Sequence, residues 1–187
     1  AMCKKLLGEN VAVLEQTIQL LDPRQVSRAV DLLRRSRRVV CMGQGSSMVL
    51  SEEAWTLFST VSPKFLFVPD SHLQMNTLAL MDPDELVLFF SYSGSTQDFQ
   101  DLLEVARQRQ VKVVLVSRFP KSPGGQLADV VLQCGADEGP LQAGSVNARM
   151  AQLFVLDVLF QEFCMRAPEE TEQSREQIAE AVARKHL

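Results

Sequence analysis

The chain has 187 residues, of which 46% are hydrophobic and 22% charged, and its formal net charge is −4. These values exclude a disordered chain and argue against a DNA-binding surface, which needs concentrated positive charge. Four scattered cysteines form no C-x-x-C pair, and no apolar run reaches membrane-spanning length. We therefore expect one cytoplasmic domain with reduced thiols, no metal, no cofactor and no membrane contact.

Two helices are predicted before the first strand. Helical spacing of apolar residues predicts a helix over Lys5–Leu21, whose apolar face is formed by Val11, Leu14, Ile18 and Leu21. The pair Asp22-Pro23 ends this helix and begins the next one, Pro23–Ser36. A basic cluster, Arg34–Arg38, closes the second helix, where we expect the cations to complement the helix dipole and stay in solvent.

From residue 37 onward, strand-like and helix-like segments alternate. Short apolar runs predict strands at Arg38–Met42, Lys64–Val68, Glu85–Phe90, Val111–Val116 and Asp129–Leu132. Helical patterns are found at Ser47–Val61, Ser71–Met81, Thr96–Gln110, Gly124–Ala128, Ser145–Phe163 and Glu169–Lys185. This alternation predicts a doubly wound α/β fold: a five-stranded parallel sheet in the flavodoxin-like order 2-1-3-4-5, with helices on both faces.

Two serine-rich loops follow the first and third predicted strands. They are the segments Gly43–Ser47 and Ser91–Thr96. In the predicted order 2-1-3-4-5 these two strands are neighbours, and the strand order reverses between them. In open α/β sheets, ligands bind outside the carboxyl ends of the strands at the point where the order reverses. Glycines let the backbone approach a ligand closely, and free amides at a helix N-terminus attract an anion. We therefore predict a phosphate site that both loops share.

Two other interpretations of these loops compete with the phosphate site. The serines and threonines could merely cap the helices that follow them. The first loop could also open a dinucleotide site, but the pattern G-x-G-x-x-G fails because Met48 stands where the third glycine should be. Two such loops on neighbouring strands favour the shared phosphate site over both alternatives.

The loop sequences Gly43-x-Gly45-x-Ser47 and Ser91-x-Ser93-Gly94-x-Thr96 resemble the two phosphosugar loops of the sugar isomerase (SIS) domain. The resemblance extends over about Val26–Glu162. Flanking segments resemble the RpiR-type transcriptional regulators of bacteria, namely Asp70–Gln74, Ser122–Val131 and Ala148–Leu153. In that family an N-terminal helix-turn-helix domain binds DNA, and the SIS domain senses a sugar phosphate.

The resemblance implies a domain division and a function. Residues 37–166 would form the phosphosugar-binding SIS domain, residues 1–36 would be helices that pack on it and link it to an upstream domain, and residues 167–187 would form a tail helix. The chain would be the effector-binding (sensor) domain of a bacterial transcriptional regulator. DNA would be contacted only through an upstream helix-turn-helix domain that this chain lacks.

The resemblance also implies the site residues. Phosphate oxygens would be held by Ser46, Ser47, Ser91, Ser93 and Thr96. The cradle would be completed by Gly45 and by the backbone amides of Gly94 and Ser95. The sugar end would be reached by Glu138 and Ser145, which lie in and at the end of the loop before the long helix.

A phosphosugar isomerase of the same family is the alternative function. Aldose–ketose isomerisation needs a general base near the sugar and usually a second acid or base. His72 is expected on the far side of the second strand from the loops, His186 lies in the tail, and Glu138 is the only carboxylate expected near the sugar. No convergent pair emerges, so a sensor without catalytic residues is favoured.

The long helix Ser145–Phe163 is apolar on more than one face. Part of it is expected in the core, and the surplus, together with the first helix, predicts a surface for a homodimer or higher homo-oligomer. Core positions are also expected for Trp55, Phe58, Phe65 and Phe67. Tyr92, between two site serines, could point toward the sugar or away from it.

Overall fold

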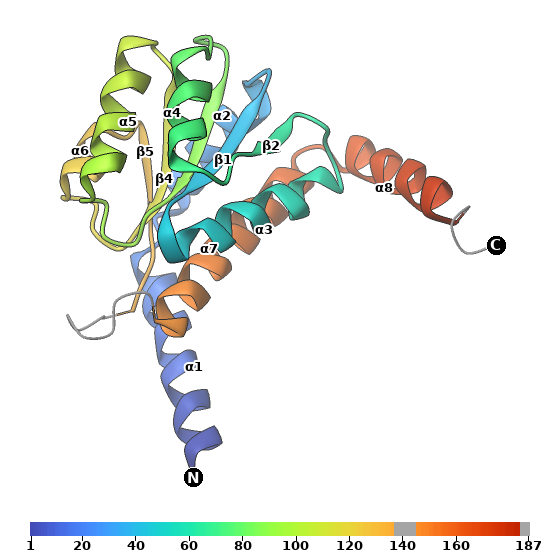
Figure 1. Ribbon diagram of the computed structural model, residues 1–187. Coiled ribbons are helices and arrows are strands. Elements are labelled where there is room, and N and C mark those ends of the chain that lie inside the picture. Colours follow the sequence, from blue (N-terminus) through green and yellow to red (C-terminus); the bar gives the residue numbers. More distant parts are fainter. Residues whose placement is uncertain (137–144, 184–187) are drawn as a thin grey trace.

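The computed structural model describes residues 1–136 and 145–183. These residues form a five-stranded parallel sheet in the order β2-β1-β3-β4-β5 (Figure 1), which confirms the predicted topology. The strands are β1 (Val39–Gly43), β2 (Phe65–Phe67), β3 (Leu86–Phe90), β4 (Lys112–Ser117) and β5 (Val130–Gln133). Each strand ends within two residues of its predicted boundary, because both faces of the sheet are covered and the apolar runs mark the buried stretches.

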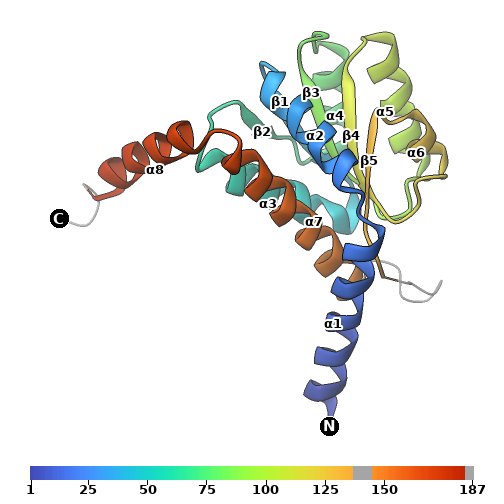
Figure 2. The ribbon, with the colours of Figure 1, turned by 180° about the vertical axis from the view of Figure 1, so that it is seen from behind.

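Helices cover both faces of the sheet (Figures 1 and 2). One face is covered by α2 (Pro23–Arg35), α3 (Met48–Ser59) and α7 (Val146–Met165), and the other by α4 (Ser71–Ala79) and α5 (Gln97–Gln108). The remaining elements are α1 (Met2–Leu20), the 3-10 turn η1 (Gly45–Ser47), α6 (Pro123–Leu127) and α8 (Pro168–Ala183). Within the described ranges, none of the helices combines the length and hydropathy needed to cross a bilayer.

Alternate residues of the strands supply two separate hydrophobic cores. In β1, Cys41 points toward α2, α3 and α7, while Val40 and Met42 point toward α4 and α5. The same alternation in β3 sends Phe90 to the first core and Phe89 to the second. Cys41 is completely buried, and this burial raises the pKa of its thiol, so the group is an inert part of the core.

Several helices begin at a side chain that accepts a hydrogen bond from the first turn. The carboxylate of Asp22 accepts from the amide of Arg24 at 2.9 Å, and Pro23 follows at the first helical position of α2. Asp70 begins α4 in the same way, accepting from the amide of Leu73 at 2.9 Å. These local contacts explain why sequence patterns locate both helix starts correctly.

One predicted core residue is exposed. Trp55 is 39% exposed and stacks on the half-buried ring of Phe67, with ring centroids 6.3 Å apart. The prediction for Trp55 is therefore wrong, because the inward positions of α3 are Leu50, Ala54 and Phe58, and residue 55 lies one step around the helix. Phe58 and Phe65 are buried as predicted.

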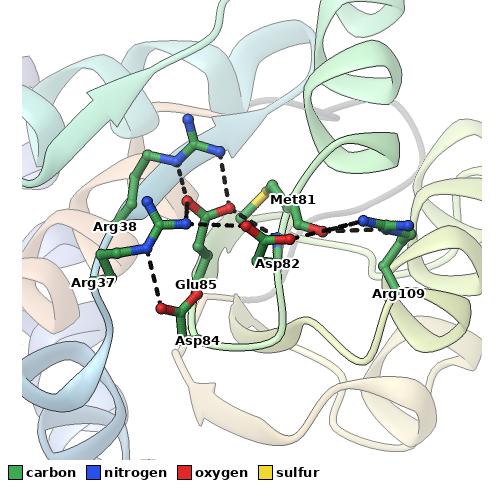
Figure 3. Close-up of polar contacts among 7 residues, drawn as sticks. All are labelled: Arg37, Arg38, Met81, Asp82, Asp84, Glu85 and Arg109. Carbon is green, nitrogen blue, oxygen red and sulfur yellow. Dashed lines mark hydrogen bonds and ion pairs between the residues drawn. The ribbon is translucent and has the colours of Figure 1, made fainter.

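The expectation that the basic cluster stays in solvent is wrong for Arg34 and Arg38, whose side chains are 26% and 34% exposed, whereas Arg37 is 57% exposed as expected. Both Arg37 and Arg38 contact acids that precede β3 (Figure 3). Arg38 contacts Glu85 through two atom pairs, Nε–Oε1 at 2.6 Å and a terminal nitrogen to Oε2 at 2.8 Å. Arg37 contacts the same carboxylate at 3.1 Å and also Asp82 and Asp84. The segment before β3 supplies these acids. The first residue of β3, Leu86, pairs with the first residue of β1, Val39, and this pairing brings the two segments together.

Candidate functional site

The two serine-rich loops meet at one edge of the sheet. The last residues of β1 and β3, Gly43 and Phe90, lie opposite each other in the parallel register, so both loops leave the sheet at the same level. A cleft of about 280 Å³ lies between them. It is lined by Gln44, Gly45, Ser46, Ser47, Phe89, Phe90, Ser91, Tyr92, Ser93 and Thr96. The structure thus brings together most of the site residues predicted from sequence.

Three glycines are required by the backbone of these loops. Gly45 and Gly94 have φ values of +56° and +62°, in the left-handed region that side chains disfavour. A Cβ atom on Gly43 would lie 2.7 Å from the backbone oxygen of Ser47, so the turn from β1 into η1 closes only around glycine. The glycines therefore shape the cleft, as the loop sequences predict.

Helix capping does not account for the hydroxyl groups. Ser47 and Thr96 stand at the N-cap positions of α3 and α5, and neither makes a side-chain cap hydrogen bond. In contrast, Asp70 and Ser122 do cap their helices through their side chains. Neither helix start is therefore capped by a hydroxyl, although at α3 the amides of Ser47 and Met48 bond to carbonyls of the preceding turn. Both helix N-termini, with their partial positive charge, lie at the cleft.

Hydrogen bonds within the second loop hold its serines in position. The hydroxyl of Ser91 accepts from the amide of Gly94 at 3.1 Å, and that of Ser93 accepts from the amide of Ser95 at 3.3 Å. A hydroxyl that accepts in this way keeps its own proton for donation to an anion. The amides of Gly94 and Ser95, predicted to contact the phosphate, are thus turned toward hydroxyls of their own loop.

Gln44 is a site residue that sequence reasoning missed. It is half-buried, it lines the cleft, and its Nε2 atom is buried without a hydrogen-bond partner among the described residues. A buried donor without a partner is uncommon in a folded protein and suits a position that a ligand oxygen completes. Its place between Gly43 and Gly45 was the only signal in the sequence.

Three residues are candidates for the sugar end of the site: Ser145, Glu138 and Tyr92. Ser145 is the N-cap of α7, its hydroxyl accepts from the amide of Ala148 at 3.1 Å, and it is not among the described residues that line the cleft. Glu138 lies outside the described residues. Tyr92 lines the cleft, and its hydroxyl donates to the carbonyl of Ala136 at 2.7 Å, beyond the end of β5.

His72 lies nearer to the loops than expected. It lines a cavity of about 220 Å³ together with Gln44, Asp98 and Asp101, and Gln44 also lines the cleft. The expectation that His72 is remote is wrong because α4 crosses back over β1 and packs beside α5. A titratable group therefore adjoins the candidate site.

Among the residues that the structure describes, no lysine or arginine lines the cleft. An anion held by these residues would therefore contact hydroxyl and amide donors and the N-termini of α3 and α5. A larger cavity, about 530 Å³, lies beside Lys112 and Asp129 at the amino ends of β4 and β5. We assign the site to the smaller cleft because ligands of such sheets bind at the carboxyl ends.

In residues 1–136 and 145–183, no group of three His, Cys, Asp or Glu residues could hold a metal ion.

The SIS domain family model matches residues 32–161 of the chain. The HTH-type transcriptional regulator YbbH of Bacillus subtilis is 28% identical over 161 residues, which cover 86% of this chain and 57% of that protein. The regulator RpiR of Escherichia coli K12 is 27% identical over 136 residues, covering 73% and 46%. The chain spans about half the length of the curated relatives it matches.

Solved structures of regulators and isomerases share the fold. Vibrio vulnificus NanR complexed with ManNAc-6P has a TM-score of 0.92 at 24% identity, covering 98% of this chain and 69% of that one. The sugar isomerase domain of an RpiR transcription factor from Sphaerobacter thermophilus has a TM-score of 0.85 at 21% identity, covering 94% and 97%. Phosphoheptose isomerase GmhA from Neisseria gonorrhoeae has a TM-score of 0.71 at 12% identity, covering 87% and 96%.

Proposed function

The chain belongs to the SIS domain family, and on that basis we propose that it is a sensor domain that binds a sugar phosphate without converting it. The observation that carries this proposal is the cleft between the two loops, where hydroxyl donors from neighbouring strands converge at two helix N-termini that no side chain caps. A phosphate held by neutral donors can enter and leave, as a sensor requires.

The proposed phosphate ligands are the hydroxyl groups that line the cleft. Ser47, Ser91, Ser93 and Thr96 would donate to phosphate oxygens, Ser46 would contribute from its exposed position, and the orphaned amide of Gln44 would donate as well. The backbone at Gly45 lets the phosphate approach α3 closely. For the sugar end we retain Glu138 and Ser145 as candidates, as the family resemblance implies.

The relatives named as HTH-type transcriptional regulators support a role in transcription control. We propose that this chain is the effector-binding part of such a regulator, which works in the cytoplasm as a homo-oligomer. DNA would be bound by a separate helix-turn-helix domain. NanR, whose solved structure contains ManNAc-6P, supports a sugar phosphate as the class of ligand.

Removal of either cleft hydroxyl is expected to weaken binding. Ser47→Ala and Ser93→Ala should each reduce the affinity for a sugar phosphate about 10- to 100-fold, because each loses a charge-assisted hydrogen bond. Isothermal titration with ManNAc-6P, arabinose 5-phosphate and a panel of hexose phosphates would measure this effect. Ser59→Ala, at the far end of α3, is the matched control and should bind like the wild type. Equal affinity in all three variants would rule out the phosphate site.

An isomerase is the second candidate, and the position of His72 favours it. His72, Asp98 and Asp101 share a cavity that adjoins the cleft, so acid and base groups stand closer to a bound sugar than the sequence indicates. We nevertheless expect no turnover: aldose and ketose phosphates incubated with the protein should keep their proportions in NMR spectra. Multiple turnovers that His72→Gln or Glu138→Gln abolishes would instead make the protein an enzyme.

A further inference from the structure

Helix α1 carries an apolar stripe that the described part of the chain leaves largely uncovered. Leu7, Val11 and Ile18 are 64%, 44% and 64% exposed. Leu14 and Leu21, which are half-buried, complete the stripe, and Leu21 also packs against the core. Both figures show the amino-terminal half of α1 projecting away from the sheet (Figures 1 and 2). We name this stripe, with Lys4 at its start, the α1 seam.

The spacing of the α1 seam is that of a coiled coil. Its members are four and three residues apart in alternation, namely Lys4, Leu7, Val11, Leu14, Ile18 and Leu21. This heptad pattern places β-branched residues at the a positions Val11 and Ile18 and leucine at every d position. That combination favours a parallel pair of identical helices, and a single lysine at an a position is typical of a device that sets register.

The seam cannot turn inward onto its own domain. The adjacent face of α1 is fixed to the segment after β5, where Gln16 Oε1 accepts from the amide of Ala136 at 2.8 Å and Thr17 Oγ1 accepts from the amide of Gly135 at 3.0 Å. Thr17 is completely buried. Because Thr17 lies about a quarter turn from the seam and Gln16 nearly half a turn from it, rotation that buried the seam would break both bonds.

The seam continues into an apolar groove at its carboxyl-terminal end. Its last members, Ile18 and Leu21, line a cavity of about 300 Å³ together with Phe154 and Val158 of α7. Toward the amino-terminal end, the residues that would flank the seam in a parallel pair are Cys3 with Gly8 and Asn10 with Glu15, so no like charges oppose each other there.

From these observations we propose that α1 pairs in parallel with the α1 helix of a second copy of this chain, through the α1 seam. This proposal specifies the homo-oligomer that the proposed function invokes. It places the amino-terminal ends of two copies side by side. The pairing does not depend on the ligand, so a failure of the pairing and a failure of the phosphate site are separate results.

Adjacent residues on α1 provide a matched test. Ile18→Lys should raise the dimer dissociation constant at least about thirtyfold, because it puts a charge into the desolvated seam. Gln19→Lys makes a similar change at an exposed neighbour outside the seam and should leave the dimer intact. Sedimentation equilibrium would measure both. A monomeric wild-type chain, or equal dimerisation in the two variants, would overturn the proposal.

Cys3 reports the direction of the pairing. It is exposed, whereas Cys41, Cys134 and Cys164 are buried. In a parallel pair, the two copies of Cys3 lie at the same end and should be joined by a short bismaleimide, and Cys3→Ser should abolish the product. In an antiparallel pair they would be roughly 27 Å apart, and a dimer without cross-linked product would contradict the parallel arrangement. Ile18→Lys should still bind sugar phosphate with wild-type affinity, which shows that the variant is folded.

Discussion

Replacement of Glu85 by glutamine should lower the free energy of unfolding by about 1–3 kcal/mol, because glutamine cannot keep the charge-assisted hydrogen bonds that the buried carboxylate makes with the half-buried Arg38. The Glu85 side chain is 1% exposed and contacts Arg38 through both carboxylate oxygens. One of these oxygens also accepts from the amide of Asp82 at 3.0 Å, so the carboxylate fixes the loop before β3 as well as the entry to β1 (Figure 3).

Asp84→Asn is the matched control for this prediction. Asp84 pairs with Arg37 in the same cluster, but its side chain is 59% exposed. An ion pair in solvent contributes about 0–1 kcal/mol, so this variant should remain close to the wild type. Urea unfolding of both variants would measure the difference. Equal loss of stability in the two variants would mean that burial of Glu85 contributes nothing.

The Glu85–Arg38 pair also predicts how the stability of the protein depends on pH. Burial by itself would raise the pKa of Glu85, but the hydrogen bonds from Arg38 and the Asp82 amide, with the charges of Arg38 and Arg37, outweigh it and lower the pKa. Because the pKa of Glu85 is lower in the folded state than in the unfolded state, its carboxylate stabilises the protein at pH values above the unfolded-state pKa. This stabilisation is lost as the pH falls through the folded-state pKa. Wild-type stability should therefore decline below about pH 4.3, and Glu85→Gln should lose less of its stability over that range.

Replacement of Gly94 by alanine should weaken sugar phosphate binding at least about 100-fold, because the second loop cannot keep its shape around a side chain. Gly94 has φ +62°, and a Cβ atom there would lie 2.3 Å from the hydroxyl oxygen of Ser122. That hydroxyl caps α6 by accepting from the amide of Gly125 at 3.1 Å. Relief of the clash must move either the cap or the segment that carries Ser93.

Gly45→Ala separates backbone strain from the clash. Gly45 also has a positive φ, +56°, but a Cβ atom there would meet nothing within 4 Å. Its alanine variant should therefore lose only about tenfold in affinity, as expected for a strained left-handed residue. Calorimetric titration with the ligand panel gives both values, and near-UV circular dichroism verifies folding. Wild-type affinity in Gly94→Ala would remove the second loop from the site.

The strand order and the pairing of the two loops could be predicted because they follow from local signals. Apolar runs mark buried strands, and the alternation of strands with helices leaves few parallel topologies. Once β1 and β3 are neighbours, the loops at 43–47 and 91–96 must meet at one edge, and the structure places them there. The division into residues 1–36, 37–166 and 167–187 stays a prediction, as does the role of each site hydroxyl.

Side-chain partners distant in sequence were decided by the tertiary structure. Arg38 and Glu85 are 47 residues apart, and a basic cluster at a helix end carries no sign of the acid that meets it. The position of His72 depends on how α4 crosses β1, and the hydroxyl direction of Tyr92 depends on where β5 ends. Periodicity states which face of an element is buried, whereas the identity of its neighbour is set by packing between elements, which no local pattern records.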